Sequence, residues 1–358
     1  MPNDWFTVRK PLTARRAVAL KLVAFLVPLV AWCVVSYVPF VWHPQRLILD
    51  SGDSTTYEEE QQLPKDAFDD EQAKLLAAGR KPMVAKAVNP VFLPAPHEVG
   101  SAMYTAFTQP PPLAGMPWLY QRIGHSVLLL AEAFVLSCLI AMPLGVLCGT
   151  FDFFSKLIEP FIDFMRYMPA PAFGALAIAI FSLGDAPKLA IIFIGLFFNM
   201  LLVTANTVRG LDGSLLEAAQ TLGASRKRLI SAVVIPGTLP QLYTDLRIAL
   251  GFGWVYLTVA ELIGEMSGIT EFLDQQRKFR NYPNVYVGII VLGVLGFLTD
   301  QFLGWLGTVL FPWHSRRRAG WIRNAFRRLR GGGGAQSSFD SAPPHQVVLS
   351  TEGANVDA

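Results

Sequence analysis

The residue types that most often carry out covalent or metal chemistry form no recognisable site in this chain. Its three cysteines, Cys33, Cys138 and Cys148, lie in apolar segments without metal-binding spacing, so buried structural thiols are expected. The five histidines form no cluster, and no Ser/His/Asp set or GxxxxGK[ST] phosphate loop occurs in a credible context. The sequence therefore predicts no catalytic residue, no metal site and no cofactor bound by this chain, which is not expected to be an enzyme.

Ionisable side chains inside apolar segments are the stronger candidates for function, because a charge in the membrane interior is costly. They are Glu132, Asp163, Arg166, Asp245, Arg247, Glu261 and Asp300. Asp163 and Arg166 are three residues apart, which on a helix predicts that they neutralise each other. The carboxylates of Glu132 and Glu261 either brace helices or line a pathway. The polar residues predicted to line a pathway are Asn199, Thr204, Tyr256, Thr258 and Glu261.

The composition indicates a membrane protein. The chain has 358 residues, of which 52% are hydrophobic and 16% charged, whereas a soluble domain has about 25% charged residues. This deficit largely excludes a soluble enzyme. The net charge of +3 is too small to indicate a nucleic-acid partner.

Apolar runs of roughly 20 residues, the length needed to cross the hydrocarbon core, recur along the chain. Six transmembrane helices are predicted, at Leu22–Trp42, Ile123–Thr150, Phe161–Leu183, Leu189–Val208, Leu239–Ile263 and Val285–Phe311. The first run could also be a signal peptide, but it is longer than a usual signal core and lacks a small-x-small cleavage site. Strict alternation of apolar and polar residues is absent, which argues against a β-barrel. The predicted fold class is an all-α membrane protein.

Basic residues near the ends of the spans predict that both termini face the cytoplasm. The predicted organisation is a cytoplasmic N-terminus (1–21), the first span (22–42), an outer segment with an acidic insertion (43–117), a five-helix core that includes a cytoplasmic loop at 209–238 (118–311), and a basic, partly disordered cytoplasmic tail (312–358). A short helix is expected at Asp66–Gly79. Residues Trp313–Arg330 would either lie on an anionic membrane surface or act only as a positive stop.

The loop between the fourth and fifth spans predicts a helix–turn–helix outside the membrane. Ser214–Leu222 contains good helix formers, and Gly223 is a probable C-terminal stop. Ser225 can cap a second helix, which Pro236 would end. The apolar face of the first helix is too short to fold alone, which is typical of a docking element for a soluble partner; the alternative is an ordinary connecting loop.

This loop resembles the EAA loop of ABC-importer permeases. Glu217-Ala218-Ala219 is followed by Gly223 and, after nine intervening residues, by Val233-Val234-Ile235-Pro236, which is the spacing of that family. Three further stretches resemble the nitrate/sulfonate/taurine-type subfamily: Arg166-Tyr167-Met168-Pro169 with Phe181-Ser182-Leu183-Gly184, Leu93-Pro94-Ala95-Pro96, and Leu246–Gly251 with Ala260-Glu261. Ser182 departs from the usual glycine, and the acidic region Asp50–Val88 looks like an insertion.

The resemblance implies the type I ABC-importer permease fold and a homodimeric transport subunit in the bacterial inner membrane. Its partners would be cytoplasmic ATPases, which bind ATP and Mg²⁺, and an extracytoplasmic solute-binding protein. Carried over by position, the residues of the coupling helix that would dock the ATPase are Glu217, Ala218, Ala219, Leu222, Gly223 and Pro236. The implied solute is nitrate, taurine or an organosulfonate-like anion, although relatives in the subfamily also carry neutral or aromatic solutes.

Two other classes of function compete with this interpretation. A secondary transporter or channel would need no ATPase, and inverted repeats with paired broken helices would favour it; no convincing repeat is visible. A membrane enzyme or signalling scaffold would need a catalytic set, which the sequence does not offer.

Overall fold

The structure is a computed structural model that describes residues 13–38, 45–54, 56–59, 61–88, 92–111 and 115–312. Residues 1–307 form one compact unit and residues 308–358 a second. The fold described below is that of the first unit. The predicted surface helix at Trp313–Arg330 and the predicted disorder of the tail lie outside the described residues.

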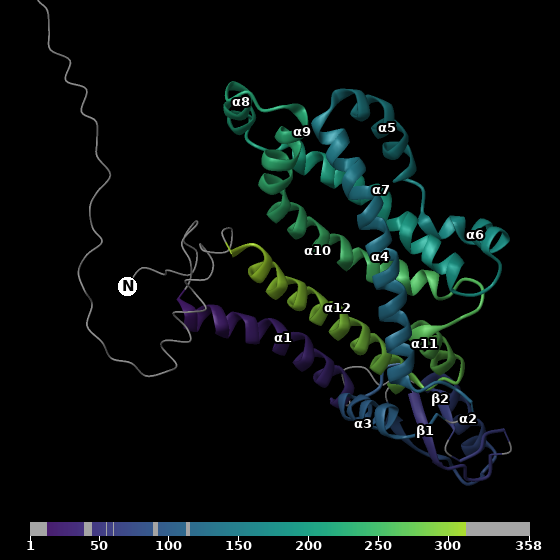
Figure 1. The fold of residues 1–358 in the computed structure, drawn as a ribbon. Helices are drawn as coiled ribbons and strands as arrows, with labels where there is room; N and C mark the ends of the chain where they lie inside the picture. Colours follow the sequence, from purple (N-terminus) through teal and green to yellow (C-terminus); the bar gives the residue numbers. More distant parts are fainter. Residues whose placement is uncertain are drawn as a thin grey trace, which may run out of the picture. The chain divides into compact units, whose positions relative to one another are not determined.

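Four helices are long and apolar enough to cross a membrane, and Figure 1 shows each as a long rod. They are α1 (Ala14–Tyr37), α4 (Leu119–Thr150), α7 (Asp185–Arg209) and α12 (Tyr282–Leu310). Each covers most of a predicted span, because an uninterrupted apolar run of this length is both a strong helix signal and a strong membrane signal. The first, second, fourth and sixth predicted spans are therefore confirmed as helices.

The third predicted span is wrong in its geometry. Instead of one helix over Phe161–Leu183, the chain forms α5 (Asp152–Met165), the short 3₁₀ helix η1 (Ala170–Phe173) and α6 (Gly174–Phe181), with an 86° bend between the two parts. Pro169 and Pro171 lie at the bend. Each removes a backbone donor and restricts the residue before it, so a straight α-helix cannot pass through this stretch.

The fifth predicted span corresponds to α10 (Ile235–Ala260), which is long enough but does not meet the hydropathy of a membrane span. Asp245, Arg247 and several hydroxyl and amide side chains lower its hydropathy. Within the described residues, four helices, or five when the bent pair counts as one, satisfy the length and composition of a span, compared with the six that were predicted. Helix α10 is the predicted span that does not satisfy these criteria.

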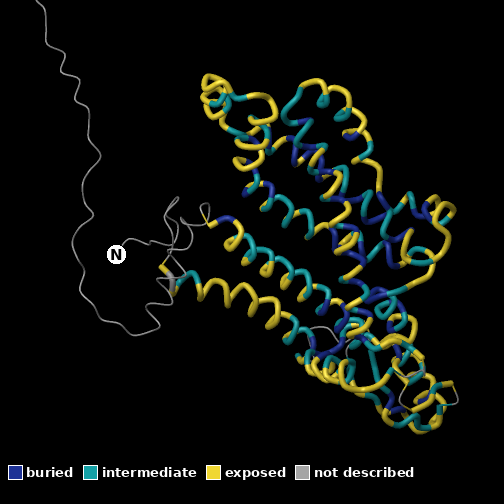
Figure 2. The backbone as a smooth tube through the Cα atoms, viewed as in Figure 1, coloured by how far each residue is buried: buried dark blue, intermediate teal, exposed yellow. Residues whose placement is uncertain are grey.

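Helices α4 and α7 form the centre of the core and pack through glycines. A methyl group on Gly145 would lie 2.6 Å from the Thr204 Cβ, and one on Gly149 would lie 2.6 Å from the Ala205 carbonyl oxygen. This Gly-x-x-x-Gly spacing is the small-residue packing by which membrane helices approach closely. Figure 2 shows α7 as the most continuously buried of the long helices, so α4 and α7 behave as one packed pair.

The segment between α1 and α4 contains a small α/β subdomain, which adds one sheet to the predicted helical fold. Its strands β1 (Gln45–Asp50), β2 (Gln62–Pro64) and β3 (Val84–Val88) form an antiparallel sheet in the order β2-β1-β3. Helix α2 (Lys65–Ala77) confirms the helix predicted at Asp66–Gly79. Ile48, Leu63, Leu75 and Met83 form a separate buried core. The strands were missed because they are three to six residues long and lack a regular alternating pattern.

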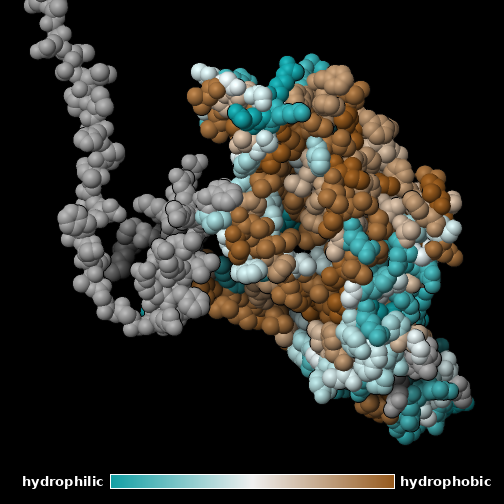
Figure 3. All heavy atoms as spheres, in the orientation of Figure 1, coloured by the Kyte–Doolittle hydropathy of each residue, from teal (hydrophilic) through white to brown (hydrophobic). Residues whose placement is uncertain are grey.

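Two short helices that the sequence did not predict, α3 (Pro96–Thr108) and α11 (Gly268–Lys278), lie at the same end of the long helices as this subdomain (Figure 1). The remaining short elements, α8 (Gly213–Thr221), α9 (Arg226–Leu229) and the π-helical turn η2 (Ile230–Val234), lie at the opposite end. Figure 3 shows that hydrophobic residues cover the surface of the long helices, whereas hydrophilic residues gather at these two ends. The first unit therefore has an apolar middle between two polar ends, as a membrane protein requires.

Candidate functional site

The segment that connects α7 to α10 forms the predicted helix–turn–helix. The Asp212 carboxylate caps α8 by accepting a hydrogen bond from the Ser214 amide at 3.0 Å, and this bond lowers the pKa of Asp212. Gly223 adopts a left-handed conformation (φ +77°) and ends the first helix, where glycine costs least. Ser225 then caps α9 through the Arg228 amide. The helix, its stop and the second cap are confirmed.

The predicted end of the second helix is wrong. Pro236 does not terminate it; the chain passes from α9 through η2 directly into α10, with Pro236 in the first turn of α10. Proline is tolerated there because the π turn before it already disrupts the regular i→i−4 bonding that the missing N–H would have joined. The helix–turn–helix is therefore continuous with α10 through one π-helical turn.

Helix α8 stands out from the rest of the molecule, as its exposed tube in Figure 2 shows. Every residue of α8 is exposed or half-exposed, including Glu217, Ala218 and Ala219. Leu222, which follows the helix, is 88% exposed and Leu215 is 49% exposed. Apolar side chains held in this way at a polar end of the molecule are available for contact with another protein. The predicted docking residues from Glu217 to Gly223 thus lie together on one protruding turn.

Arg209, the last residue of α7, fixes this segment to α4 and α5. Its guanidinium forms an ion pair with Glu159 of α5 and donates a hydrogen bond to Ser155 Oγ at 3.0 Å. It also donates to the Cys148 carbonyl oxygen at 3.5 Å, in the last turn of α4. A cation is favoured at the carboxyl ends of two helices, where free carbonyls gather. The helix–turn–helix is thus held firmly on the α7 side and continues through a π turn on the α10 side.

A cavity of about 360 Å³ lies between α7 and α10, the two helices that the docking segment connects. Three of the predicted lining residues, Asn199, Thr204 and Tyr256, border it. The Tyr256 ring rests against Gly195, where an added Cβ would lie 2.8 Å from the ring atoms. The remaining lining residues are Leu196, Met200, Val203, Leu242, Asp245, Leu246, Ile248, Ala249 and Phe252.

The other two predicted lining residues lie elsewhere. Thr258 donates a hydrogen bond to the Val255 carbonyl oxygen in its own helix. Glu261 is fully buried directly after the end of α10. Asp245, one of the ionisable residues singled out in the sequence, lines the cavity and accepts hydrogen bonds from Thr207 of α7 and from Gln241. The cavity is therefore mainly apolar, with one carboxylate and a few polar groups.

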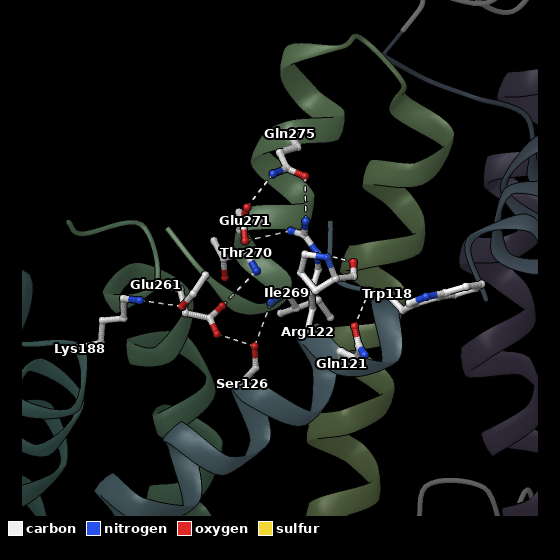
Figure 4. Close-up of polar contacts among 12 residues, drawn as sticks. Trp118, Gln121, Arg122, Ser126, Lys188, Glu261, Ile269, Thr270, Glu271 and Gln275 are labelled. Atoms are coloured by element: carbon white, nitrogen blue, oxygen red, sulfur yellow. Dashed lines mark hydrogen bonds and ion pairs between the residues drawn. The ribbon is translucent and has the colours of Figure 1, made fainter. Parts of the chain in front are cut away.

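A buried polar network lies at the opposite end of the helices (Figure 4). Ser126 Oγ of α4 donates to Glu261 Oε1 at 2.5 Å and accepts a bond from the Ile269 amide at 2.9 Å. The second oxygen of Glu261 accepts from the Thr270 amide at 3.1 Å. Ser126 and Glu261 are both fully buried. Two amides in the first turn of α11 are thus satisfied by side chains from α4 and α10.

Charged residues extend this network on both sides. Lys188 of α7 is 1% exposed and donates hydrogen bonds to Ser267 Oγ at 2.7 Å and to Asp185 at 3.1 Å. Arg122 of α4, also buried, forms an ion pair with Glu271 at 3.1 Å and donates to Gln275 at 3.1 Å. Figure 4 shows Arg122 pointing toward α11. Buried charges are tolerated when they are paired and hydrogen-bonded in this way.

The other charged residues singled out in the sequence have mainly structural partners. Arg166 and Asp163 form the predicted ion pair at 3.2 Å. Arg247 forms an ion pair with Asp300 of α12 at 2.8 Å. Glu132 lies on the exposed side of α4. On α11, Asp274 is paired with Lys278 and Arg277, which lower the pKa of its carboxyl group.

Comparison with known proteins adds the decisive information. Residues 141–309 match the family described as "binding-protein-dependent transport system inner membrane component". The chain is 30% identical over 232 residues to the taurine transport system permease protein TauC of Escherichia coli, a match that covers 63% of this chain and 82% of TauC.

The chain belongs to this family of ABC-importer permeases.

It is also 32% identical over 197 residues to the putative aliphatic sulfonates transport permease protein SsuC of Bacillus subtilis, which covers 55% of this chain and 71% of SsuC. Among solved structures, a chain of the inward-facing MetNI methionine ABC transporter is similar with a TM-score of 0.49 and 17% identity, covering 57% of this chain and 100% of that chain. The permease is a multi-pass membrane transport subunit and not an enzyme, as the resemblance implied.

Sequence reasoning missed several residues that the structure brings into these sites. Arg209, Ser126, Lys188 and Arg122 all lie at or near the ends of apolar runs, where a polar residue is easily assigned to the water interface. Their burial and their partners on distant helices depend on the tertiary fold. The signal that could have found them is the presence of Arg122 and Lys188 within one or two turns of the start of a span.

Proposed function

We propose that this permease is driven by cytoplasmic ATPase subunits that dock on α8 and the turn after it. The observation that supports this most is the protruding helix with exposed Leu215, Glu217 and Leu222, placed between the two helices that border the cavity. ATP and Mg²⁺ are bound by the ATPase. When the ATPase moves α8, the force reaches α4, α5 and α7 through Arg209, whereas α10 is connected through a π turn.

The end that carries α8 faces the cytoplasm in this proposal. Arg226, Lys227 and Arg228 of the docking segment lie at that end. The contacts of Trp32 with Tyr286 and of Tyr37 with His97 put the carboxyl end of α1 near the other polar end, so Arg15 and Arg16 at its amino end lie on the α8 side. Basic residues gather on the cytoplasmic side of membrane proteins. Arg277 and Lys278, which lie at the other end, both form ion pairs with Asp274.

The solute is proposed to be a small sulfonate or a similar oxyanion, delivered by an extracytoplasmic solute-binding protein to a dimer of two permease copies. This rests on the names of the two relatives, which are permeases for taurine and for aliphatic sulfonates. The cavity itself is mainly apolar and is lined by one carboxylate rather than by a cation. The Asp245 carboxylate repels an anion, so tight binding in this cavity is not expected, and the binding protein would then determine selectivity.

Two substitutions test the docking proposal. Glu217→Lys and Gly223→Asp are expected to reduce co-purification of the ATPase by at least about tenfold, because a reversed charge or a side chain at a left-handed glycine disrupts the contact surface. Glu265→Lys, an exposed carboxylate after α10 at the other polar end, is the matched control. Uptake should fall in parallel with ATPase binding, while the amount of permease in the membrane stays unchanged. Normal ATPase binding and normal uptake in both α8 variants would refute the proposal.

A further inference from the structure

The first turn of α11 depends on two other helices for its hydrogen bonds. An α-helix normally satisfies its first free amides with the side chain of its own N-cap residue. In α11 the Ile269 amide donates to Ser126 of α4 and the Thr270 amide donates to Glu261 after α10. The N-cap residue Ser267 instead accepts a hydrogen bond from Lys188 of α7. The position of α11 is therefore determined by α4, α7 and α10 together.

Gly268 is the residue that allows this contact. It adopts a left-handed conformation (φ +67°), and a methyl group added to it would lie 1.9 Å from Glu261 Oε1 and 2.4 Å from Ser126 Oγ. No side chain fits in that space. The carboxylate and the hydroxyl are packed directly against the backbone at the start of α11, so the network is closed to water at this point.

The network lies next to the end of the cavity. Glu261 follows Tyr256, a lining residue, by five positions, which is about 7.5 Å along the helix direction. Lys188 precedes Gly195, another lining residue, by seven positions, or about 10.5 Å. The side chains that hold α11 are therefore the next layer beyond the cavity, on the side away from α8.

We propose that Glu261, Ser126 and Lys188 are positioning residues that hold the amino end of α11 as the outer closure of the α7–α10 cavity. The inference rests on the proposed function, in which that cavity is the pathway and the α11 end faces outward. In this closure the amino end of α11 is joined to α4, to α7 and to the residue after α10 by hydrogen bonds, whereas Ile269 and Phe272 on its other side pack in an apolar cluster with α3, α4 and α12. Polar groups that separate can exchange their partners for water, whereas an apolar seal of the same area would expose hydrophobic surface each time it opened. The network is therefore suited to open and close repeatedly.

Chemical accessibility of the cavity tests this closure without relying on transport. Asn199→Cys places a thiol in the cavity of a variant in which Cys33, Cys138 and Cys148 are replaced by alanine. Its reaction with a membrane-impermeant maleimide is followed from the outer side of intact cells and, separately, from the cytoplasmic side of inverted vesicles. We expect slow outer labelling in this parent, and labelling that is about tenfold faster when Gly268→Ala displaces Glu261 and Ser126.

Gly264→Ala is the matched control. Gly264 is also left-handed (φ +73°), but its added methyl group would meet only Ile178 at 3.3 Å and, farther away, Leu183. Both alanine variants introduce the same kind of backbone strain, but only Gly268→Ala disturbs the network. Glu261→Gln, which keeps the size of the side chain but cannot accept both hydrogen bonds, is the second variant should Gly268→Ala fail to reach the membrane. It is expected to accelerate outer labelling in the same direction.

The outcomes separate this inference from the proposed function. Equal outer labelling in the Gly264→Ala and Gly268→Ala variants, or no acceleration in either network variant, would overturn the closure, even if the cavity is labelled from the cytoplasmic side. A thiol that reacts from neither side in any variant would overturn both the pathway and its closure. Docking of the ATPase on α8 is measured independently by co-purification, which the network variants should leave unchanged.

Discussion

Close packing of α4 against α7 gives a quantitative prediction through Gly149. In Gly149→Ala the new methyl group would lie 2.6 Å from both the Ala205 carbonyl oxygen and the Val208 Cβ. Forcing an extra carbon into a packed interface costs about 1–3 kcal/mol. The same change also gains about 1 kcal/mol of helix propensity, which would partly conceal the cost. A control with the same gain and without the collision is needed.

Gly124→Ala is that control, because Gly124 lies in the same helix and its added methyl group would meet only open space among the described residues. The difference between the two variants isolates the packing cost of about 1–3 kcal/mol. An unfolding entropy of about 2.1 cal/mol/K per residue gives about 1.3 °C per kcal/mol for a chain of 358 residues, so the Tm of Gly149→Ala should be about 1–4 °C below that of Gly124→Ala. Thermal unfolding of the purified permease in detergent measures both.

The same experiment can refute the packing argument. If Gly149→Ala is as stable as Gly124→Ala, α4 and α7 do not approach at this position. Gly145→Ala provides a second test, since its methyl group would lie 2.6 Å from the Thr204 Cβ and 2.7 Å from the Leu201 carbonyl oxygen. It should be destabilised relative to Gly124→Ala in the same way.

Three further predictions concern the ends of the molecule. Arg209→Gln should lower uptake by about tenfold while ATPase co-purification stays normal, because charged hydrogen bonds to α4 and α5 are lost. The control is Lys156→Gln, on the exposed side of α5. Equal uptake in the two variants would contradict the role of Arg209. The Asp50–Lys81 ion pair (2.7 Å) lowers the pKa of Asp50 below its usual 3.8 and raises that of Lys81 above 10.5. The stabilisation by this pair should therefore be lost only as the pH falls through the lowered pKa or rises through the raised one. At neutral pH, Asp50→Asn should speed hydrogen exchange in β1–β3, and an unchanged rate would contradict the pairing. Deleting residues 45–88 should leave membrane insertion and ATPase binding normal, because this subdomain has its own core. Failure of the variant to insert, judged by membrane fractionation, would show that the long helices depend on the subdomain.

Features with a strong local signal could be predicted from the sequence. Four long apolar runs became α1, α4, α7 and α12, because length and hydropathy suffice to specify such helices. The turn after α8 was also predictable, because Gly223 and Ser225 have strong local preferences for a left-handed stop and an N-cap.

Features that depend on distant contacts could not be predicted. Ser126 and Glu261 are 135 residues apart, and Lys188 and Ser267 are 79 residues apart, so their pairing exists only after the helices have packed. Hydropathy averages over a window, and for that reason the 86° bend between α5 and α6 was missed although Pro169 and Pro171 were visible. Bracing was one of two interpretations of Glu261, beside pathway lining, and the sequence could not show that it accepts a hydrogen bond from the first turn of α11.

The π turn η2 is a local feature that the sequence also did not predict. Pro236 is a strong signal for the end of a helix, and the sequence prediction placed one there. In the structure, the wider turn at Ile230–Val234 lets α9 pass into α10 without a break. The proline then occupies the first turn of the next helix, where it is well tolerated.

Cross-linking from Leu222 tests the central claim most directly, since this side chain is 88% exposed at the end of α8. A photoactivatable group attached to Leu222→Cys in the assembled transporter should form an adduct with the ATPase. The same group at Tyr120→Cys, which is 54% exposed at the start of α4 and lies about 45 Å along that helix from its other end, should form none. An ATPase adduct from position 120, or its absence from position 222 in a transporter that takes up solute, would contradict the proposed docking of the ATPase on α8.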